Sequence, residues 1–433
     1  MKYKLANDVF YRLYGENVLL YQTAAGMVYV FSETAKTLLD FFKDETDEDE
    51  VIAKIAGTYL VTEGDKEALK AFIADLKDKK ILIPEYKLTR EIMNVETKFR
   101  EEMLPKGQLY SAMFELTYRC NEKCRYCYCT VDDTNELTTD EIKKALDELY
   151  DMNVFNVTFT GGDLFVRKDT FEILEYAYSK NFLIDIFTNG IALTDDDIFR
   201  LRKINPRSIH FTLYHYLAEK HDWFTQVPGS FNRTVSAIKK CLAMNIPVTV
   251  KHTVTTCSLD AIEGLMQFVK ELGAAIQIGI SVSAKNDGDK EPVQFRLTTK
   301  EEYMQALTKI SKNFTLTCTD NLPPDLHGER NLCGAGKHAI NISPYGDVMP
   351  CNALQIVCGN IRKQSIKEIW ETSEELQKIR NYKMKDIKGC ENCDKLDFCS
   401  FCPGMAMTET GDPLLKHADV CLVAEARKAL AAK

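Results

Sequence analysis

The stretch CNEKCRYCYC, residues 120–129, places four cysteines within ten residues. It follows the apolar run LYSAMFELTY, residues 109–118, which is typical of a buried β-strand. Three kinds of structure fit such a cluster: a disulfide knot, a zinc site, or three thiolates that hold an iron-sulfur cluster with one cysteine to spare. The choice among them decides most of what the sequence says about function.

The composition favours metal ligation over disulfides. The chain has 433 residues, enough for roughly three domains. With 45% hydrophobic and 27% charged residues it has the composition of an ordinary soluble globular protein. The net charge of -9 and the lack of a basic tract exclude a surface built for nucleic acid. We find neither a signal peptide nor an apolar run long enough to span a membrane, so we predict a cytoplasmic protein. Because the cytoplasm keeps thiols reduced, the 15 cysteines point to metal ligands.

Downstream of residue 107, short apolar strands alternate with amphipathic helices, which predicts a parallel sheet. Helix starts are marked by Thr138 with Glu141 and by Thr194 with Asp197. Six such units through residue 312 predict an α/β fold, a partial (β/α)6 TIM-like barrel, with its active site at the C-terminal ends of the strands. The strands are expected near residues 109–116, 156–160, 183–188, 208–213, 247–252 and 276–281.

Two further domains flank this barrel. Residues 1–88 contain a hairpin pattern around Ala25 and Gly26 followed by helical periodicity, which predicts a small winged-helix-like unit. Residues 89–106 are expected to be a linker. Past Asp320 cysteine, glycine and proline dominate, so residues 313–433 are expected to be held by metal clusters rather than by a large core.

The first cysteine cluster fits an iron-sulfur site best. Cys120, Cys124 and Cys127 have the spacing C-x3-C-x2-C. A structural zinc site usually takes four ligands as two C-x2-C pairs. A c-type haem would need histidine at position 128, which is Tyr128. Three thiolates suit a cubane cluster with one iron open for chemistry, and Cys129 is then a spare thiol.

This loop resembles that of the radical S-adenosylmethionine (SAM) enzymes. The resemblance implies a [4Fe-4S] cluster whose open iron binds SAM, and reductive cleavage of SAM to a 5′-deoxyadenosyl radical. It also implies that TFTGGD after the second strand receives the SAM ammonium, although Asp163 stands where the family often has Glu. The cofactor contacts implied are Tyr126, Gly161, Gly162, Asp163, Asn189 and Thr212. His221 and Asp222 lie in a segment like one in peptide-modifying members, and we interpret them as structural.

The C-terminal cysteines resemble the SPASM domain, which holds two auxiliary iron-sulfur clusters. The resemblance implies that Cys333, Cys351 and Cys402 hold the nearer cluster, with Cys318 or Cys358 or a substrate group completing it. The farther cluster would be held by Cys390, Cys393, Cys399 and Cys421. CSFC departs from the family in having two residues before Cys402 instead of three. The alternative is a zinc knuckle of Cys390, Cys393, Cys399 and Cys402, whose five-residue middle loop is short for zinc.

The N-terminal module resembles the PqqD-like domain that binds the leader of a ribosomally made precursor peptide. Leader docking is expected at the strand MVYVFS against the helix EALKAFIADLKDK, by strand addition. The expected function is therefore a peptide maturase, served by a donor such as flavodoxin or ferredoxin. A thioether crosslink is our first choice, with a carbon-carbon or carbon-oxygen link or an epimerisation as alternatives. Rival functions are sulfatase-maturase-like oxidation of a Cys or Ser side chain and a non-enzymatic iron-sulfur or binding protein.

Overall fold

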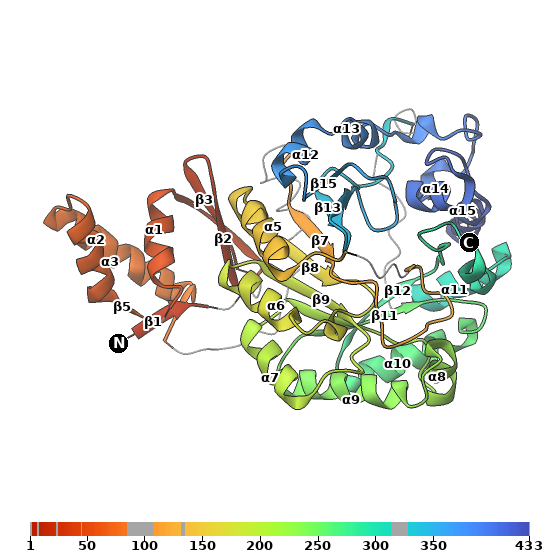
Figure 1. The fold of residues 1–433 in the computed structure, drawn as a ribbon, viewed down its shortest axis with the longest axis horizontal. Coiled ribbons are helices and arrows are strands. Elements are labelled where there is room, and N and C mark those ends of the chain that lie inside the picture. Colours follow the sequence, from red (N-terminus) through yellow and green to blue (C-terminus); the bar gives the residue numbers. More distant parts are fainter. Residues whose placement is uncertain are drawn as a thin grey trace.

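The computed structural model describes residues 2–6, 8–22, 25–44, 46–84, 107–130, 135–312 and 328–432. The expected linker 89–106 and Cys318 lie outside these residues, as does the beginning of the expected third domain. Figure 1 shows three parts along the chain: a small N-terminal module, a central sheet with helices, and a C-terminal part beside that sheet.

The N-terminal module contains the expected hairpin within a larger arrangement of strands and helices. β3 (Asn17–Gln22) pairs antiparallel with β4 (Met27–Ser32), and β2 (Val9–Tyr14) adds to the other side of β3. A second small sheet has the order β5-β1-β6. Its strands are β1 (Lys2–Leu5), β5 (Thr46–Asp47) and β6 (Leu82–Ile83), and the helices are α1 (Thr34–Phe41), α2 (Glu48–Thr58) and α3 (Glu63–Asp78).

The central part is an α/β fold around a parallel sheet, as the sequence predicts. Six consecutive strands pair in parallel in chain order, which is the partial barrel arrangement. They are β7 (Ser111–Glu115), β8 (Asn156–Thr160), β9 (Leu183–Thr188), β10 (Ser208–Thr212), β11 (Val248–Thr253) and β12 (Ala275–Gly279). The expected strand ranges differ from these by at most two residues at each end.

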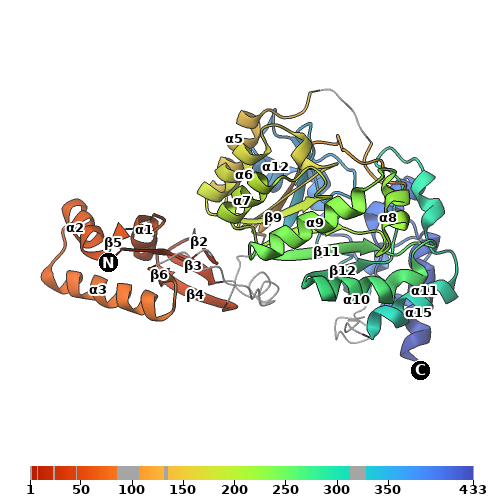
Figure 2. The same ribbon diagram turned by 90° about the horizontal axis from the view of Figure 1, so that it is seen from below.

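Helices cover the outer face of this sheet (Figure 2). Both expected helix starts form capping boxes, Thr138 with Glu141 and Thr194 with Asp197. Buried aliphatic and aromatic side chains of the strands and helices pack there into one large core. The helices are α5 (Thr139–Asp151), α6 (Thr170–Ser179), α7 (Asp195–Ile204), α8 (Ala218–Thr225), α9 (Ser230–Ala243), α10 (Ile262–Leu272) and α11 (Lys300–Ser311).

The C-terminal part extends the same sheet, which the sequence did not predict. β13 (Ala339–Ile342) pairs in parallel with β7, and β14 (Asp347–Met349) and β15 (Gly359–Asn360) follow it antiparallel. This segment thereby lies beside the first barrel strand. The remaining helices are α12 (Ile366–Thr372), α13 (Glu374–Arg380), α14 (Pro403–Thr410) and α15 (Ala418–Ala431). Among the described residues no helix is both long and apolar enough to cross a membrane.

Candidate active site

A cavity of about 690 Å³ opens at the C-terminal ends of the barrel strands. The residues 120–129 form one wall of it, and the ends of β8 to β11 form the floor. Five of the six expected cofactor contacts line it, together with the four cysteines of the loop. These residues are Tyr126, Gly161, Gly162, Asn189, Thr212, Cys120, Cys124, Cys127 and Cys129.

The cysteine loop is held in place by the helix α8. The amide of Lys123 donates to the carbonyl of Thr225 at 3.0 Å, and the amide of Arg125 donates to the carbonyl of Phe224 at 3.0 Å. The guanidinium of Arg125 also lies 4.1 Å from the ring centre of Trp223, within the range of a cation-π contact. The segment after the fourth strand therefore serves as a support for the loop that carries the cysteines.

A buried carboxylate ties this loop to the barrel and to the C-terminal part. Glu115, the last residue of β7, accepts hydrogen bonds from the hydroxyls of Tyr118 and Tyr128 at 3.0 and 3.1 Å. Asn341 on β13 donates to the same carboxylate at 2.8 Å. Burial raises the pKa of Glu115, although all three hydrogen bonds favour its charged form.

The glycine pair after β8 allows the cysteine loop to approach closely. A Cβ at Gly162 would lie 2.6 Å from the carbonyl oxygen of Tyr118 and still nearer that of Arg119. Gly161 has φ of 140°, which disfavours any residue with a side chain. Two glycines are thus required here by backbone contact with the residues immediately before Cys120.

Asp163 lies beneath the cavity rather than in its lining. Its carboxylate accepts from the hydroxyl of Thr188 at 2.7 Å and from the amides of Asn189 and Phe165 at 2.9 Å. Burial raises the pKa of Asp163 against these hydrogen bonds. We expected Asp163 to contact the cofactor, but both oxygens are engaged inside the fold. As placed, it orients Asn189, whose amide nitrogen lies 3.6 Å from the sulfur of Cys120.

Aromatic rings surround Tyr126, between the second and third cysteines of the motif. Its ring centre lies 5.1 Å from that of Tyr214 and 5.8 Å from that of Phe224, both in edge-on geometry. Thr212 ends β10 and pairs in register with Lys251 on β11. This half of the cavity is therefore suited to a flat, partly apolar group, whereas the half near Asn189 is polar.

The structure brings the C-terminal cysteines together in the two groups that the sequence assigns. Cys402 lies close enough to Cys333 and Cys351 for charge on one to affect the others. Cys399 has the same relation to Cys390, Cys393 and Cys421. Cys402 is thus placed with the first group, which disfavours the zinc knuckle. Cys358 is buried in the main core, where the neighbours that affect its thiol are Ser373, Glu375 and Arg380, so it does not complete the first group.

The donor set suits iron-sulfur clusters better than single ions. Within the described parts of the chain, no three His, Cys, Asp or Glu side chains are arranged to hold one metal ion. Iron-sulfur clusters are held by cysteine thiolates, and the donors in each group are cysteines. Burial raises the pKa of Cys120 to about 12, and a bound cation would favour its thiolate form. Cys120, Cys124 and Cys127 fit such a group.

The sequence analysis did not assign several polar residues that line the cavity, among them Lys251, Lys285 and Asn352. Lys251 lies on β11, two residues before the strand ends, with its ammonium 4.0 Å from the ring centre of Phe187, and burial lowers its pKa. Lys285 comes from the polar loop after β12, and Asn352 follows Cys351. Only the position of Lys251 near the C-terminal end of a predicted strand was a signal in the sequence, because Lys285 and Asn352 reach the cavity from distant segments.

His221 and Asp222 have the structural roles expected of them. Asp222 accepts hydrogen bonds from the amides of Gly229 and Phe231 at 2.6 and 2.8 Å, at the beginning of α9. His221 is buried, and its Nδ1 accepts from the amide of Tyr214 at 3.3 Å.

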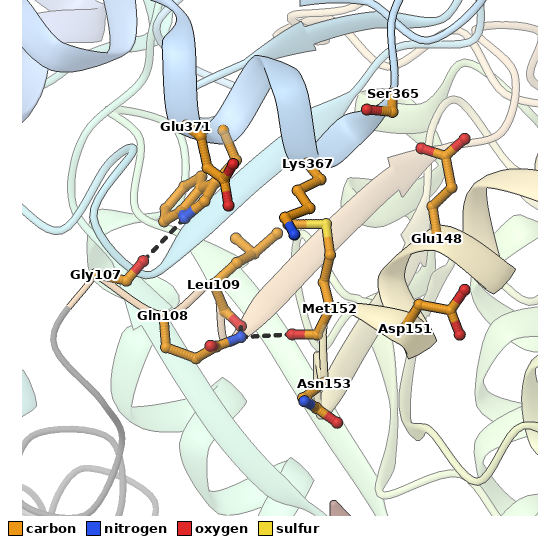
Figure 3. Close-up of a pocket in the computed structure, with 11 residues that line it drawn as sticks. Gly107, Gln108, Leu109, Glu148, Asp151, Met152, Asn153, Ser365, Lys367 and Glu371 are labelled. Carbon is orange, nitrogen blue, oxygen red and sulfur yellow. Dashed lines mark hydrogen bonds between the residues drawn. The ribbon is translucent and has the colours of Figure 1, made fainter. Parts of the chain in front are cut away.

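A second hollow of about 600 Å³ lies at the opposite end of the strands. Figure 3 shows it between residues 107–109, which lead into β7, and residues 365–371 of the C-terminal part. Glu148, Asp151 and Lys367 face it, and no cysteine lines it. Because active sites of such barrels form at the C-terminal strand ends, we assign the chemistry to the cysteine cavity.

Comparisons with known proteins agree with this assignment. Residues 114–257 match the model of the radical SAM superfamily, and residues 333–394 match that of the SPASM iron-sulfur cluster-binding domain. An AdoMet-dependent heme synthase of Methanosarcina barkeri is 27% identical over 296 residues, which cover 62% of this chain and 84% of that relative. The antilisterial bacteriocin subtilosin biosynthesis protein AlbA of Bacillus subtilis is 29% identical over 268 residues, 60% of this chain and 59% of that relative.

A solved structure matches nearly the whole fold. Streptococcus suis SuiB bound to precursor peptide SuiA has a TM-score of 0.61 at 14% sequence identity. The match covers 97% of this chain and 100% of SuiB.

Proposed function

We propose that this chain, which matches the radical SAM and SPASM models, is a radical SAM enzyme that modifies a ribosomally made precursor peptide. We divide it into a precursor-recognition domain of the PqqD-like, winged-helix kind at residues 1–88, a linker, a barrel at residues 107–312 and the SPASM domain at residues 313–433. SuiB is bound to a precursor peptide, and AlbA is named for bacteriocin biosynthesis. Both similarities support a peptide substrate for this chain.

A groove on the N-terminal module is the observation that carries this proposal. It measures about 380 Å³ and lies between β4 and the helices α1 and α3. β4 is the edge of its sheet, and Met27 and Val30 on it are 48% and 51% exposed. An exposed edge strand beside an apolar groove suits strand addition by a peptide. The side chains that line the groove include Phe31, Leu38, Leu69 and Phe72.

The cysteine cavity is the proposed site of reaction. Cys120, Cys124 and Cys127 would hold the cluster that binds SAM, and this group would supply a 5′-deoxyadenosyl radical for removal of a hydrogen atom from the peptide. The chain would position the cofactor: Gly161 and Gly162 let the cysteine loop approach closely and line the cavity, and Asn189 offers its side-chain amide at the polar end. Tyr126 and Thr212 line the rest of the cavity.

We propose an intramolecular crosslink as the product, with a thioether first and a carbon-carbon or carbon-oxygen link as alternatives. Forming a thioether from a thiol and a carbon removes two hydrogens from the peptide in total. The reaction therefore needs an electron acceptor besides the radical, and the cysteine groups of the SPASM domain are where the chain would hold one. A small acidic electron carrier, flavodoxin or ferredoxin, is the proposed reductant.

The test uses enzyme reconstituted anaerobically with iron and sulfide, SAM, dithionite and the peptide encoded beside its gene. A peptide mass lower by two hydrogens, with deoxyadenosine formed, is the expected result. Deoxyadenosine formed without any change in peptide mass would contradict the proposal. A sulfatase-maturase-like enzyme would keep its activity on a short peptide after deletion of residues 1–88, whereas a leader-dependent enzyme would not.

Binding of the leader is tested separately by Ala68→Glu. Ala68 lines the groove on α3, so a carboxylate there opposes apolar docking and should weaken leader binding by roughly tenfold or more. Ala71→Glu places the same side chain on the same helix outside the groove. Equal affinities of the two variants for a fluorescent leader peptide would exclude this groove.

A further inference from the structure

Both faces of the strands β2 and β3 are buried, which a small free-standing module would not need. On β2, Val9 and Tyr11 pack into the core of the module, whereas Phe10 belongs to a different cluster. That cluster contains Tyr110, Phe155 and Leu183, which lie at the amino-terminal ends of β7, β8 and β9. The sheet is therefore a layer between the helices of the module and the barrel, as Figure 1 shows.

Arg12 on β2 is the charged residue at the centre of this contact. It is 3% exposed, and its guanidinium carbon lies 5.1 Å from the ring centres of Tyr150 and Phe182 and 5.4 Å from that of Phe155. Its Nε donates to the carbonyl of Val154 at 3.0 Å. A guanidinium is planar and weakly hydrated, so it can stack on rings where an ammonium would not.

Among the described residues the ionisable groups that affect Arg12 are tyrosines rather than carboxylates, and its Nη2 has no hydrogen-bond partner there. Burying an unpaired charge costs free energy that an apolar side chain of the same size would not. Such a residue adds little net stability to the fold. It does make one orientation of the module relative to the barrel much lower in free energy than the others. Tyr14 reinforces this orientation, since its hydroxyl donates to the carbonyl of Asn153 at 2.8 Å.

We propose that Arg12 locks the N-terminal module onto the amino-terminal end of the barrel and so acts as a positioning residue for peptide delivery. The groove beside β4 and the cysteine cavity are then held at opposite ends of the barrel strands. The consequence for the substrate rests on the proposed function. One peptide must pass the length of a strand and the thickness of the sheet, at least about 25 Å. That span takes roughly eight residues of extended chain between the leader segment and the modified residue.

Small-angle X-ray scattering of the intact, anaerobically purified protein tests whether Arg12 holds the N-terminal module against the barrel. Arg12→Glu places an unpaired carboxylate against the rings and the carbonyl, so the module should detach and the radius of gyration should rise by roughly a tenth or more. Arg200→Glu makes the same charge change on the exposed surface of α7 and should scatter like wild type. Uncoupled SAM cleavage should be equal in all three proteins, because the barrel is intact.

If the scattering curve of Arg12→Glu superimposes on that of wild type, the proposed role of Arg12 is wrong. If that variant does not fold, Tyr150→Lys opposes Arg12 from the barrel side and must give the same expansion. Deleting residues between the leader and the modified site of the precursor should abolish modification below the predicted span while leaving leader binding unchanged. Modification that persists with no spacer would overturn the fixed arrangement, whereas an unmodified full-length precursor would count against the proposed function alone.

Discussion

Substitution of Gly162 by alanine is the sharpest test of how the cysteine loop is positioned. A Cβ there would lie 2.6 Å from the carbonyl oxygen of Tyr118, whereas ordinary carbon-oxygen contacts are about 3.3 Å. The loop would therefore have to move by at least about 0.7 Å. Because misplacement of reacting groups by about 1 Å can cost a hundredfold in rate, we expect SAM cleavage to fall by roughly that factor.

The assay measures iron per chain and deoxyadenosine formed by the reconstituted variant without peptide. Gly57→Ala is the matched control, since its Cβ would meet no atom within 4 Å and the residue lies inside α2. Alanine should stabilise that helix by up to about 1 kcal/mol and leave SAM cleavage unchanged. Wild-type iron content and deoxyadenosine rate in Gly162→Ala would refute the claim that the glycine pair sets the loop position.

Three further predictions follow from single residues. Cys124→Ala should abolish deoxyadenosine formation and lower the iron content by one cluster. Cys241 lies on α9 and is buried in the hydrophobic core, so Cys241→Ala should leave both unchanged. Burial lowers the pKa of His252 from 6.5 to about 4. The unfolded chain therefore binds the proton first, and stability that is intact above pH 6.5 should fall by about 3 kcal/mol as the pH drops to 4. Urea unfolding of wild type and His252→Asn checks this. Asp185→Asn removes the carboxylate that pairs with Arg207 inside the barrel and should destabilise the fold by about 3 to 5 kcal/mol, seen as a lower unfolding temperature.

Local sequence patterns were enough to predict the barrel and the three cysteines Cys120, Cys124 and Cys127. Strand and helix periodicity reports which side chains are buried, and it placed six strands to within two residues of those observed. Cys120, Cys124 and Cys127 lie on one loop, so their spacing alone brings them together. Thr138 and Thr194 form helix caps with residues three positions away, which is a local interaction as well.

Tertiary structure alone decided which distant segments meet. Periodicity indicates that a residue is buried, but it does not indicate which residues cover it. The alternation along β2 therefore could not show that Arg12 contacts aromatic rings of the barrel. Asn341 and Glu115 are 226 residues apart, and only the pairing of β13 with β7 brings them into contact. Asp163 shows the same limit within the site. Its place in the motif is local, but the direction of its carboxylate depends on Thr188 and Asn189 of the next strand end.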